Sequence, residues 1–306
     1  MSKIIPIISE PTKTAPKPLS TLRIWIEFLR LPSLPLSLSG VGFGNFWAYK
    51  TGIFSWSIFW LSLLTTVFLH LLTNVANDYG DAPHDKRVKG LLAYNKVHLQ
   101  DLFWAMCTLT ALSIISGLAL IAVSPLSSAI ILLILGALAI VAAITYTVGK
   151  KPYGYYGFGD ISVLLFFGFL SVLGSFYVQT GMFQAALLLP ALAIGLWSVA
   201  ILNINNMRDI KSDVLAKKHT LATKLGLYKA KLYHFAILLI ALFSWSIFAW
   251  QQRDWVSALL TLGFTIANIH ITHLSTRQPK LFDTAMQFMT FSIIGIVLCF
   301  LLTPLK

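Results

Sequence analysis

Two clusters of carboxylate and amide side chains stand at the ends of long apolar stretches. The first comprises Asn74, Asn77, Asp78, Asp81 and Asp85, and the second comprises Asn203, Asn205, Asn206, Asp209 and Asp213. The spacing of the first set places its members along one face of a helix. Both sets fall at the C-terminal end of a predicted helix, where the helix dipole already contributes about half a negative charge. Five aspartates in such a position need positive compensation.

A divalent cation would supply that compensation. Mg²⁺ prefers hard oxygen ligands, is commonly held by one or two carboxylates, and completes its shell with water and substrate phosphate. A phosphate-bearing substrate would also explain the Lys and Arg residues of the same segments, because both side chains bind phosphate oxygens. Solvated charges that help to end helices are the alternative interpretation of any single aspartate.

The two clusters repeat one pattern. Shifted by 128 residues, Asn77-Asp78-x-x-Asp81-x-x-x-Asp85 lies over Asn205-Asn206-x-x-Asp209-x-x-x-Asp213. This match predicts an internal repeat of about four helices. It also argues that the aspartates act as a set.

A third polar segment, residues 146–160, is rich in glycine and tyrosine and contains Lys150 and Lys151. One interpretation is a turn at the membrane interface with ordinary basic residues. The other is that a tyrosine and two lysines lie beside the metal cluster and hold a diphosphate. The residues leave both interpretations open.

The composition restricts the class of protein that carries these clusters. Of the 306 residues, 57% are hydrophobic and 11% are charged, whereas soluble domains carry about 25% charged residues. This excludes a water-soluble enzyme, a disordered chain and a nucleic-acid-binding protein, although the net charge is +12. Cys107 and Cys299 both lie in apolar runs, so a disulfide scaffold is excluded as well.

The apolar stretches predict an all-α polytopic membrane protein with nine spans. A spanning helix needs about 20 mostly apolar residues. Stretches without Asp, Glu, Lys or Arg that meet or nearly meet this length are 31–49, 51–77, 102–123, 127–148, 161–178, 183–207, 232–250, 255–276 and 284–305. The spans form a single transmembrane domain, residues 21–306, which begins with an amphipathic interfacial helix at 21–30. Residues 1–20 lack an apolar core and are expected to be a cytosolic tail.

The basic residues predict the orientation. With the N-terminus inside, 20 of the 23 Lys and Arg residues and ten of the 11 acids fall on the cytoplasmic side. Such a bias is typical of multi-pass proteins of the cell (inner) membrane. The polar clusters are therefore expected on the cytoplasmic side and the C-terminus outside.

These segments together resemble the UbiA superfamily of intramembrane prenyltransferases. The family motif N-D-x-x-D-x-x-x-D is matched by Asn77, Asp78, Asp81 and Asp85, and D-x-x-x-D by Asp209 and Asp213. Within the superfamily the chain is most similar to the menaquinone branch. The strings that carry this similarity are 72–81, 143–149, 157–168 and 202–213. The resemblance covers most of residues 30–230.

The resemblance implies a fold and a reaction. It implies a bundle of nine helices that transfers a polyprenyl group from polyprenyl diphosphate to 1,4-dihydroxy-2-naphthoate in the membrane lipid, with loss of CO₂, to give demethylmenaquinone. It assigns Mg²⁺ to Asp78, Asp81, Asp85, Asp209 and Asp213. It assigns the diphosphate to Asn74, Asn77, Asn206, Arg208, Lys150, Lys151 and Lys218. Tyr146 would stabilise the allylic cation that forms when the diphosphate leaves.

The chain departs from the branch in two places. The segment after Asp85 reads Lys-Arg-Val-Lys-Gly, where a longer stretch is usual, and Arg30 is followed by leucine, where an Arg-Pro pair is common. The first departure leaves open which basic residues close over the diphosphate. His70 lies one turn before Asn74 and is a candidate for supporting the site, whereas His270 and His273 are expected to be interhelical polar residues.

Two other functions compete with this one. A prenyltransferase for another aromatic acceptor, such as 4-hydroxybenzoate, would carry the same motifs. A secondary transporter would also show repeats and polar helix interruptions, but its binding groups lie near the bilayer midplane. The cores of the predicted spans contain no Asp, Glu, Lys or Arg, which disfavours transport.

Overall fold

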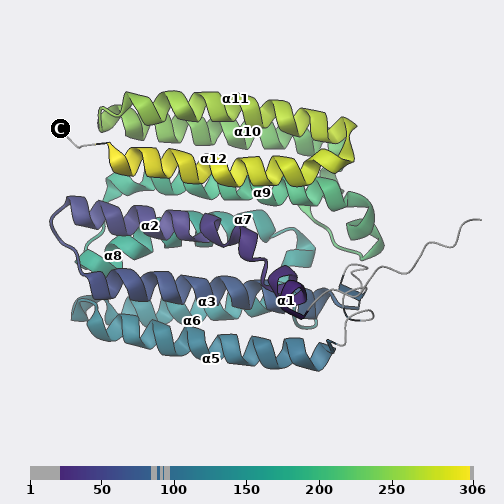
Figure 1. The fold of residues 1–306 in the computed structure, drawn as a ribbon, viewed down its shortest axis with the longest axis horizontal. Coiled ribbons are helices and arrows are strands. Elements are labelled where there is room, and N and C mark those ends of the chain that lie inside the picture. Colours follow the sequence, from purple (N-terminus) through teal and green to yellow (C-terminus); the bar gives the residue numbers. More distant parts are fainter. Residues whose placement is uncertain (1–20, 84–87, 90–91, 93–96, 304–306) are drawn as a thin grey trace, which may run out of the picture.

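The chain forms a bundle of long helices (Figure 1). The computed structural model describes residues 21–83, 88–89, 92 and 97–303, and these residues contain helices and turns but no β-strand. The predicted tail at 1–20 and the predicted ligand Asp85 lie outside the described residues. The all-α class that the apolar stretches predict is confirmed.

The helices follow the predicted spans closely. In chain order they are α1 (Thr21–Leu29), α2 (Leu34–Lys50), α3 (Trp56–Asp81), α5 (Leu99–Val123), α6 (Ala129–Thr145), α7 (Gly159–Val163), the π-helical segment η4 (Leu164–Gly174), α8 (Ser175–Thr180), α9 (Leu188–Leu215), α10 (Leu221–Gln251), α11 (Trp255–Arg277) and α12 (Phe282–Leu302). Because α3 ends at Asp81 and α9 continues to Leu215, the residues of both polar clusters that the structure describes are helical, as predicted.

Eight of these helical stretches are long and apolar enough to cross a membrane. One of them, 159–180, is a single span built from α7, η4 and α8. The expected first span corresponds to α2, whose 17 residues extend over roughly 25 Å, less than the hydrocarbon thickness of about 30 Å. The structure therefore supports eight spans, and the ninth stays a prediction, although α2 runs alongside the other long helices in Figure 1.

The amphipathic segment before the first span is a helix, as expected. In α1, Ile24 and Phe28 are buried at 2% and 0% exposure, where they pack into the cluster formed with α3, α5 and α6. Arg30 ends this helix in the left-handed conformation, with φ 47° and ψ 45°. The location of α1 at a membrane surface stays a prediction.

The long helices form two groups joined by a central layer. In Figure 1, α3, α5 and α6 lie on one side, α9 to α12 lie on the other, and α2 with α7 and α8 lie between them. The central layer is tightly packed because Gly40 and Gly44 of α2 meet Ser171 and Ser175 of the other central span so closely that a Cβ on either glycine would collide with the serine hydroxyl. The two motif helices, α3 and α9, are thereby held on opposite sides of the layer.

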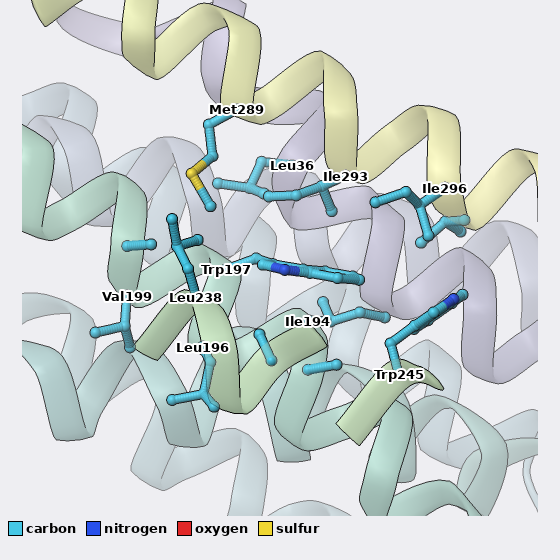
Figure 2. Packing of buried hydrophobic residues seen from close by; sticks show 14 of the residues in the cluster. Leu36, Ile194, Leu196, Trp197, Val199, Leu238, Trp245, Met289, Ile293 and Ile296 are labelled. Atoms are coloured by element: carbon cyan, nitrogen blue, oxygen red, sulfur yellow. The ribbon is translucent and has the colours of Figure 1, made fainter. Parts of the chain in front are cut away.

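The group formed by α9 to α12 has an aromatic core. Figure 2 shows Trp197 of α9 and Trp245 of α10 beneath Met289, Ile293 and Ile296 of α12. The two indole rings lie 5.4 Å apart between centroids, and both side chains are almost fully buried. Helix association within a membrane depends on such van der Waals packing. This packing holds α9, the helix that carries the second motif, against α10 and α12.

Candidate active site

A cavity of about 1670 Å³ lies between the two groups of helices. At one end it is lined by the polar residues of the two aspartate motifs, and elsewhere by apolar residues of α5, α6 and η4. The apolar lining includes Ile114, Leu118, Leu133, Phe166, Phe167 and Leu170. A compound with an anionic head and a hydrocarbon chain would match both parts of this cavity.

The structure brings most of the predicted site residues to this cavity. Those that line it are Asn74, Asn77, Asp81, Tyr146, Asn206, Arg208, Asp209, Asp213 and Lys218. Asp78 is fully buried beside Arg30, which itself lines the cavity. Lys150 and Lys151 are exposed and are not part of the cavity wall.

The first motif is buried and already bonded to basic residues. The Nη2 atom of Arg30 lies 2.9 Å from Oδ1 of Asp78, whose side chain is 1% exposed. Asp81, 5% exposed, accepts hydrogen bonds from Lys218 Nζ at 2.5 Å and from Tyr155 Oη at 2.8 Å. Each carboxylate is therefore paired with a basic side chain from another part of the chain, and such pairing compensates a buried negative charge.

The segments that supply Lys218 and Tyr155 are joined to each other. The backbone N–H of His219 donates to the carbonyl of Tyr155 at 2.9 Å, and the Lys218 ammonium lies 5.0 Å from the centroid of the Tyr155 ring. The loop after α6 and the turn after α9 thus meet at Asp81. A tyrosine of this loop does reach the motif, but the two lysines of the loop do not line the cavity.

The second motif is more open. The side chain of Asp209 is 34% exposed, and Arg208 binds both of its oxygens, at 2.9 Å and 2.8 Å. The same guanidinium donates to Asp283 of α12 at 2.6 Å and to Asn205 at 2.5 Å. Arg208 therefore links the end of α9 to the start of α12 in the cavity wall.

Asn74 supports the start of α2. Its side-chain N–H₂ donates to the carbonyl of Leu29 at 3.1 Å and lies 3.0 Å from Nε2 of His70. If Nε2 accepts this hydrogen bond, the ring proton lies on Nδ1, which faces Ser37 Oγ at 2.6 Å. His70 and Asn74 thus anchor the break between α1 and α2 on the face of α3.

Tyr146 lies in the cavity wall directly after α6. Its phenol is neutral at physiological pH, because the usual pKa of a tyrosine side chain is about 10. Its ring packs edge-on against Tyr153, with centroids 5.3 Å apart. A neutral aromatic face in an apolar wall is suited to stabilising a cation.

The donor set at the polar end fits a hard divalent cation. Carboxylate and amide oxygens from α3 and α9 line the same cavity end, and these are ligands that Mg²⁺ prefers. Within the described residues, no three His, Cys, Asp or Glu side chains converge as a ready-made metal cluster. A metal held here would draw on carboxylates from both helices, and its remaining coordination positions would be open to oxygens of a second ligand.

Comparisons with known proteins identify the family. The model of the UbiA prenyltransferase family matches residues 37–294. A 1,4-dihydroxy-2-naphthoate octaprenyltransferase from Haemophilus influenzae is 41% identical over 272 residues, which cover 85% of this chain and 88% of that protein. The enzyme of the same name from Escherichia coli is 44% identical over 238 residues, covering 75% of this chain and 77% of that protein.

A solved structure shares the fold. The structure of a UbiA homolog from Archaeoglobus fulgidus bound to GPP and Mg²⁺ superposes with a TM-score of 0.64 at 16% identity, covering 90% of this chain and 98% of that one. The fold and the two aspartate motifs define an intramembrane prenyltransferase. The chain belongs to the UbiA prenyltransferase family.

The structure also places residues at the site that the sequence did not single out. Arg30 reaches Asp78 across 48 positions in the chain, and Asp283 reaches Arg208 across 75. Tyr155 was one of several tyrosines in its loop, with no local signal to distinguish it. The one sequence signal near Arg30 is the leucine that follows it, where an Arg-Pro pair is common.

Proposed function

We propose that this chain transfers a polyprenyl group from polyprenyl diphosphate to 1,4-dihydroxy-2-naphthoate, with loss of CO₂, to give demethylmenaquinone. The observation that carries the proposal is the similarity to two enzymes named for this acceptor, at 41% and 44% identity. The cavity with one polar and one apolar part supports it, because a prenyl diphosphate has the same two-part character.

Donor binding is assigned to the polar end. Asp78, Asp81, Asp209 and Asp213 would hold Mg²⁺, which when bound neutralises charge on the leaving diphosphate. Asp85 is kept as a further candidate ligand. Asn77, Asn206, Arg208 and Lys218 would contact the diphosphate directly, whereas Asn74 would act by fixing the α1–α2 break. Lys150 and Lys151 would contribute only at longer range.

The chemistry then needs a dry site for a cation. As the C–O bond of the donor breaks, an allylic cation forms, and the Tyr146 ring can stabilise it by its aromatic face. The apolar wall from α5, α6 and η4 excludes water, which would otherwise capture the cation. The electron-rich ring carbon of the naphthoate forms the new C–C bond, and the carboxylate leaves as CO₂.

The proposed orientation has the polar end facing the cytoplasm. It can be tested in a variant with Cys107 and Cys299 replaced by serine. A cysteine placed at Lys150 should react with an impermeant maleimide only in inside-out vesicles. A cysteine placed at Arg253 should react only in spheroplasts, and the reverse pattern would overturn the orientation.

A direct assay tests the function. The purified chain, Mg²⁺ and geranyl diphosphate should give a prenylated naphthoquinol from 1,4-dihydroxy-2-naphthoate, and EDTA should abolish the product. If product forms from 4-hydroxybenzoate but not from the naphthoate, the chain is a prenyltransferase for another aromatic acceptor. No product from either acceptor would overturn the proposal.

A further inference from the structure

We propose that Arg30 is a substrate-binding residue that changes partner during the reaction cycle. In the substrate-free protein its guanidinium neutralises Asp78. When Mg²⁺ takes Asp78, Arg30 turns to an oxyanion of a bound substrate. This inference rests on the proposed function, because it requires an anionic substrate and a metal in the same cavity.

Arg30 stands at the boundary between the cavity and the buried aspartate. Its side chain is 36% exposed and lines the cavity, whereas the side chain of Asp78 is 1% exposed. The hydrogen bond to Asp78 Oδ1 uses one of the five N–H donors of the guanidinium. The planar fork of these donors matches phosphate and carboxylate oxygens. Arg30 can therefore receive an anion on its cavity side.

The backbone at Arg30 is held in an unusual conformation. A left-handed residue other than glycine is uncommon and costs free energy, yet Arg30 has φ 47°. The carbonyl of Arg30 accepts hydrogen bonds from Ser33 N at 2.9 Å and Ser33 Oγ at 2.8 Å, and Asn74 binds the preceding carbonyl. Three hydrogen bonds thus fix a turn that directs the arginine towards the cavity and α3.

The charges at this position require the exchange. A buried carboxylate needs a counter-charge, and Arg30 supplies it at 2.9 Å. A divalent cation on Asp78 would replace that counter-charge and leave two positive groups side by side. The diphosphate of the donor and the carboxylate of the naphthoate are the anions that the reaction brings in. Either would restore the balance at Arg30.

The exchange makes metal binding depend on the substrate. Without substrate, the metal must compete with Arg30 for Asp78, so the metal alone binds weakly. This can be measured with Mn²⁺ by electron paramagnetic resonance on the purified full chain. We expect R30Q to bind Mn²⁺ about tenfold more tightly than the unsubstituted protein in the absence of substrate. R277Q, which changes an exposed arginine at the end of α11 outside the cavity wall, should bind it unchanged.

Two further titrations identify the oxyanion. Geranyl diphosphate and 1,4-dihydroxy-2-naphthoate are each titrated with Mn²⁺ present, and R30Q should weaken one of them by about 10- to 100-fold, as expected for a charge-assisted hydrogen bond. R30K should recover part of the loss. Unchanged or weaker Mn²⁺ binding by R30Q, or unchanged binding of both substrates, would overturn the inference.

R30Q leaves the Asp78 carboxylate buried without its cation, and this can prevent folding. A second pair of variants tests the inference in that case. D78N and D78N/R30Q both lack that charge. In EDTA, the double variant should bind the identified oxyanion about tenfold more weakly than D78N, and equal binding would overturn the inference. If the unsubstituted protein itself binds neither substrate, the proposed function fails instead.

Discussion

The polar motifs at the ends of α3 and α9 share one pattern, in which Asp81 corresponds to Asp209, but their surroundings differ. Asp78 and Asp81 are buried and bonded to basic residues from distant parts of the chain. Asp209 is 34% exposed and is bonded to its neighbour in sequence, Arg208. The difference suggests a division of labour, in which the α3 half is prearranged by the fold and the α9 half takes its final arrangement from metal and substrate.

The largest expected effect is at Asp81, where the fold has arranged the most contacts. Asp81→Asn removes a charge bonded to both Lys218 and Tyr155, and we expect kcat/KM to fall by about 1000-fold or more. Additional Mg²⁺ should not restore the rate. Asp101→Asn is the matched control, because Asp101 caps α5 away from the cavity. An active Asp81→Asn enzyme would end the assignment of this motif to the metal.

Asp209 should respond differently if the α9 half is assembled by ligands. We expect Asp209→Asn to lower kcat/KM by about 100-fold, with partial recovery as Mg²⁺ is raised, because the other oxygens of the open site can still bind the ion. The measurement is the Mg²⁺ dependence of the initial rate. The same dependence for Asp209→Asn and Asp81→Asn would contradict the proposed difference between the two halves.

Tyr155→Phe tests the neutral part of the α3 arrangement. It removes the hydroxyl 2.8 Å from Asp81 but keeps the ring that faces Lys218. A hydrogen bond to a charged group contributes about 1.5–3 kcal/mol, so we expect roughly a 10- to 100-fold loss in kcat/KM. Tyr156→Phe is the control, because that side chain is exposed and does not line the cavity. A loss above 100-fold would give Tyr155 a direct role in the reaction.

The smallest effect is expected for the two lysines of the loop. Lys150 and Lys151 are exposed and lie outside the cavity wall, so their charge acts through water and is screened by salt. The double change to glutamine should raise KM for geranyl diphosphate by less than about threefold at physiological salt. A tenfold rise would show that this loop closes over the diphosphate.

Local patterns account for what the sequence predicted well. Long runs without charged residues located most spanning helices within a few residues. The exceptions are α9, which continues to Leu215 beyond the predicted end at 207, and α10, which begins at Leu221 before the predicted start at 232 and has a positive-φ break at Gly226. The helical spacing of Asn74, Asn77 and Asp81 correctly placed them together on the cavity. Each signal lies within a single helix, so it can be recognised in the sequence before the helices are packed together.

The site residues that the sequence did not predict depend on contacts between distant parts of the chain. The pairing of Arg30 with Asp78 depends on the turn after α1, and that turn depends on hydrogen bonds to α3. The bond from Arg208 to Asp283 depends on how α12 packs on α9. Conversely, Lys150 and Lys151 were predicted to bind the diphosphate because lysine binds phosphate oxygens. In the structure it is Tyr155 of the same loop that contacts the first motif, at Asp81.

The close contact of α2 with the span formed by η4 and α8 limits how this cavity can change over evolutionary time. Gly40 and Gly44 leave no room for any side chain against the facing serines, so mutation has little freedom to widen or narrow the cavity along that seam. The opposite wall is different. Gly136 of α6 has open space where a side chain would stand, and Gly117 of α5 has one neighbour at 3.9 Å. Inherited variation in the size of the accepted prenyl chain should therefore accumulate on α5 and α6.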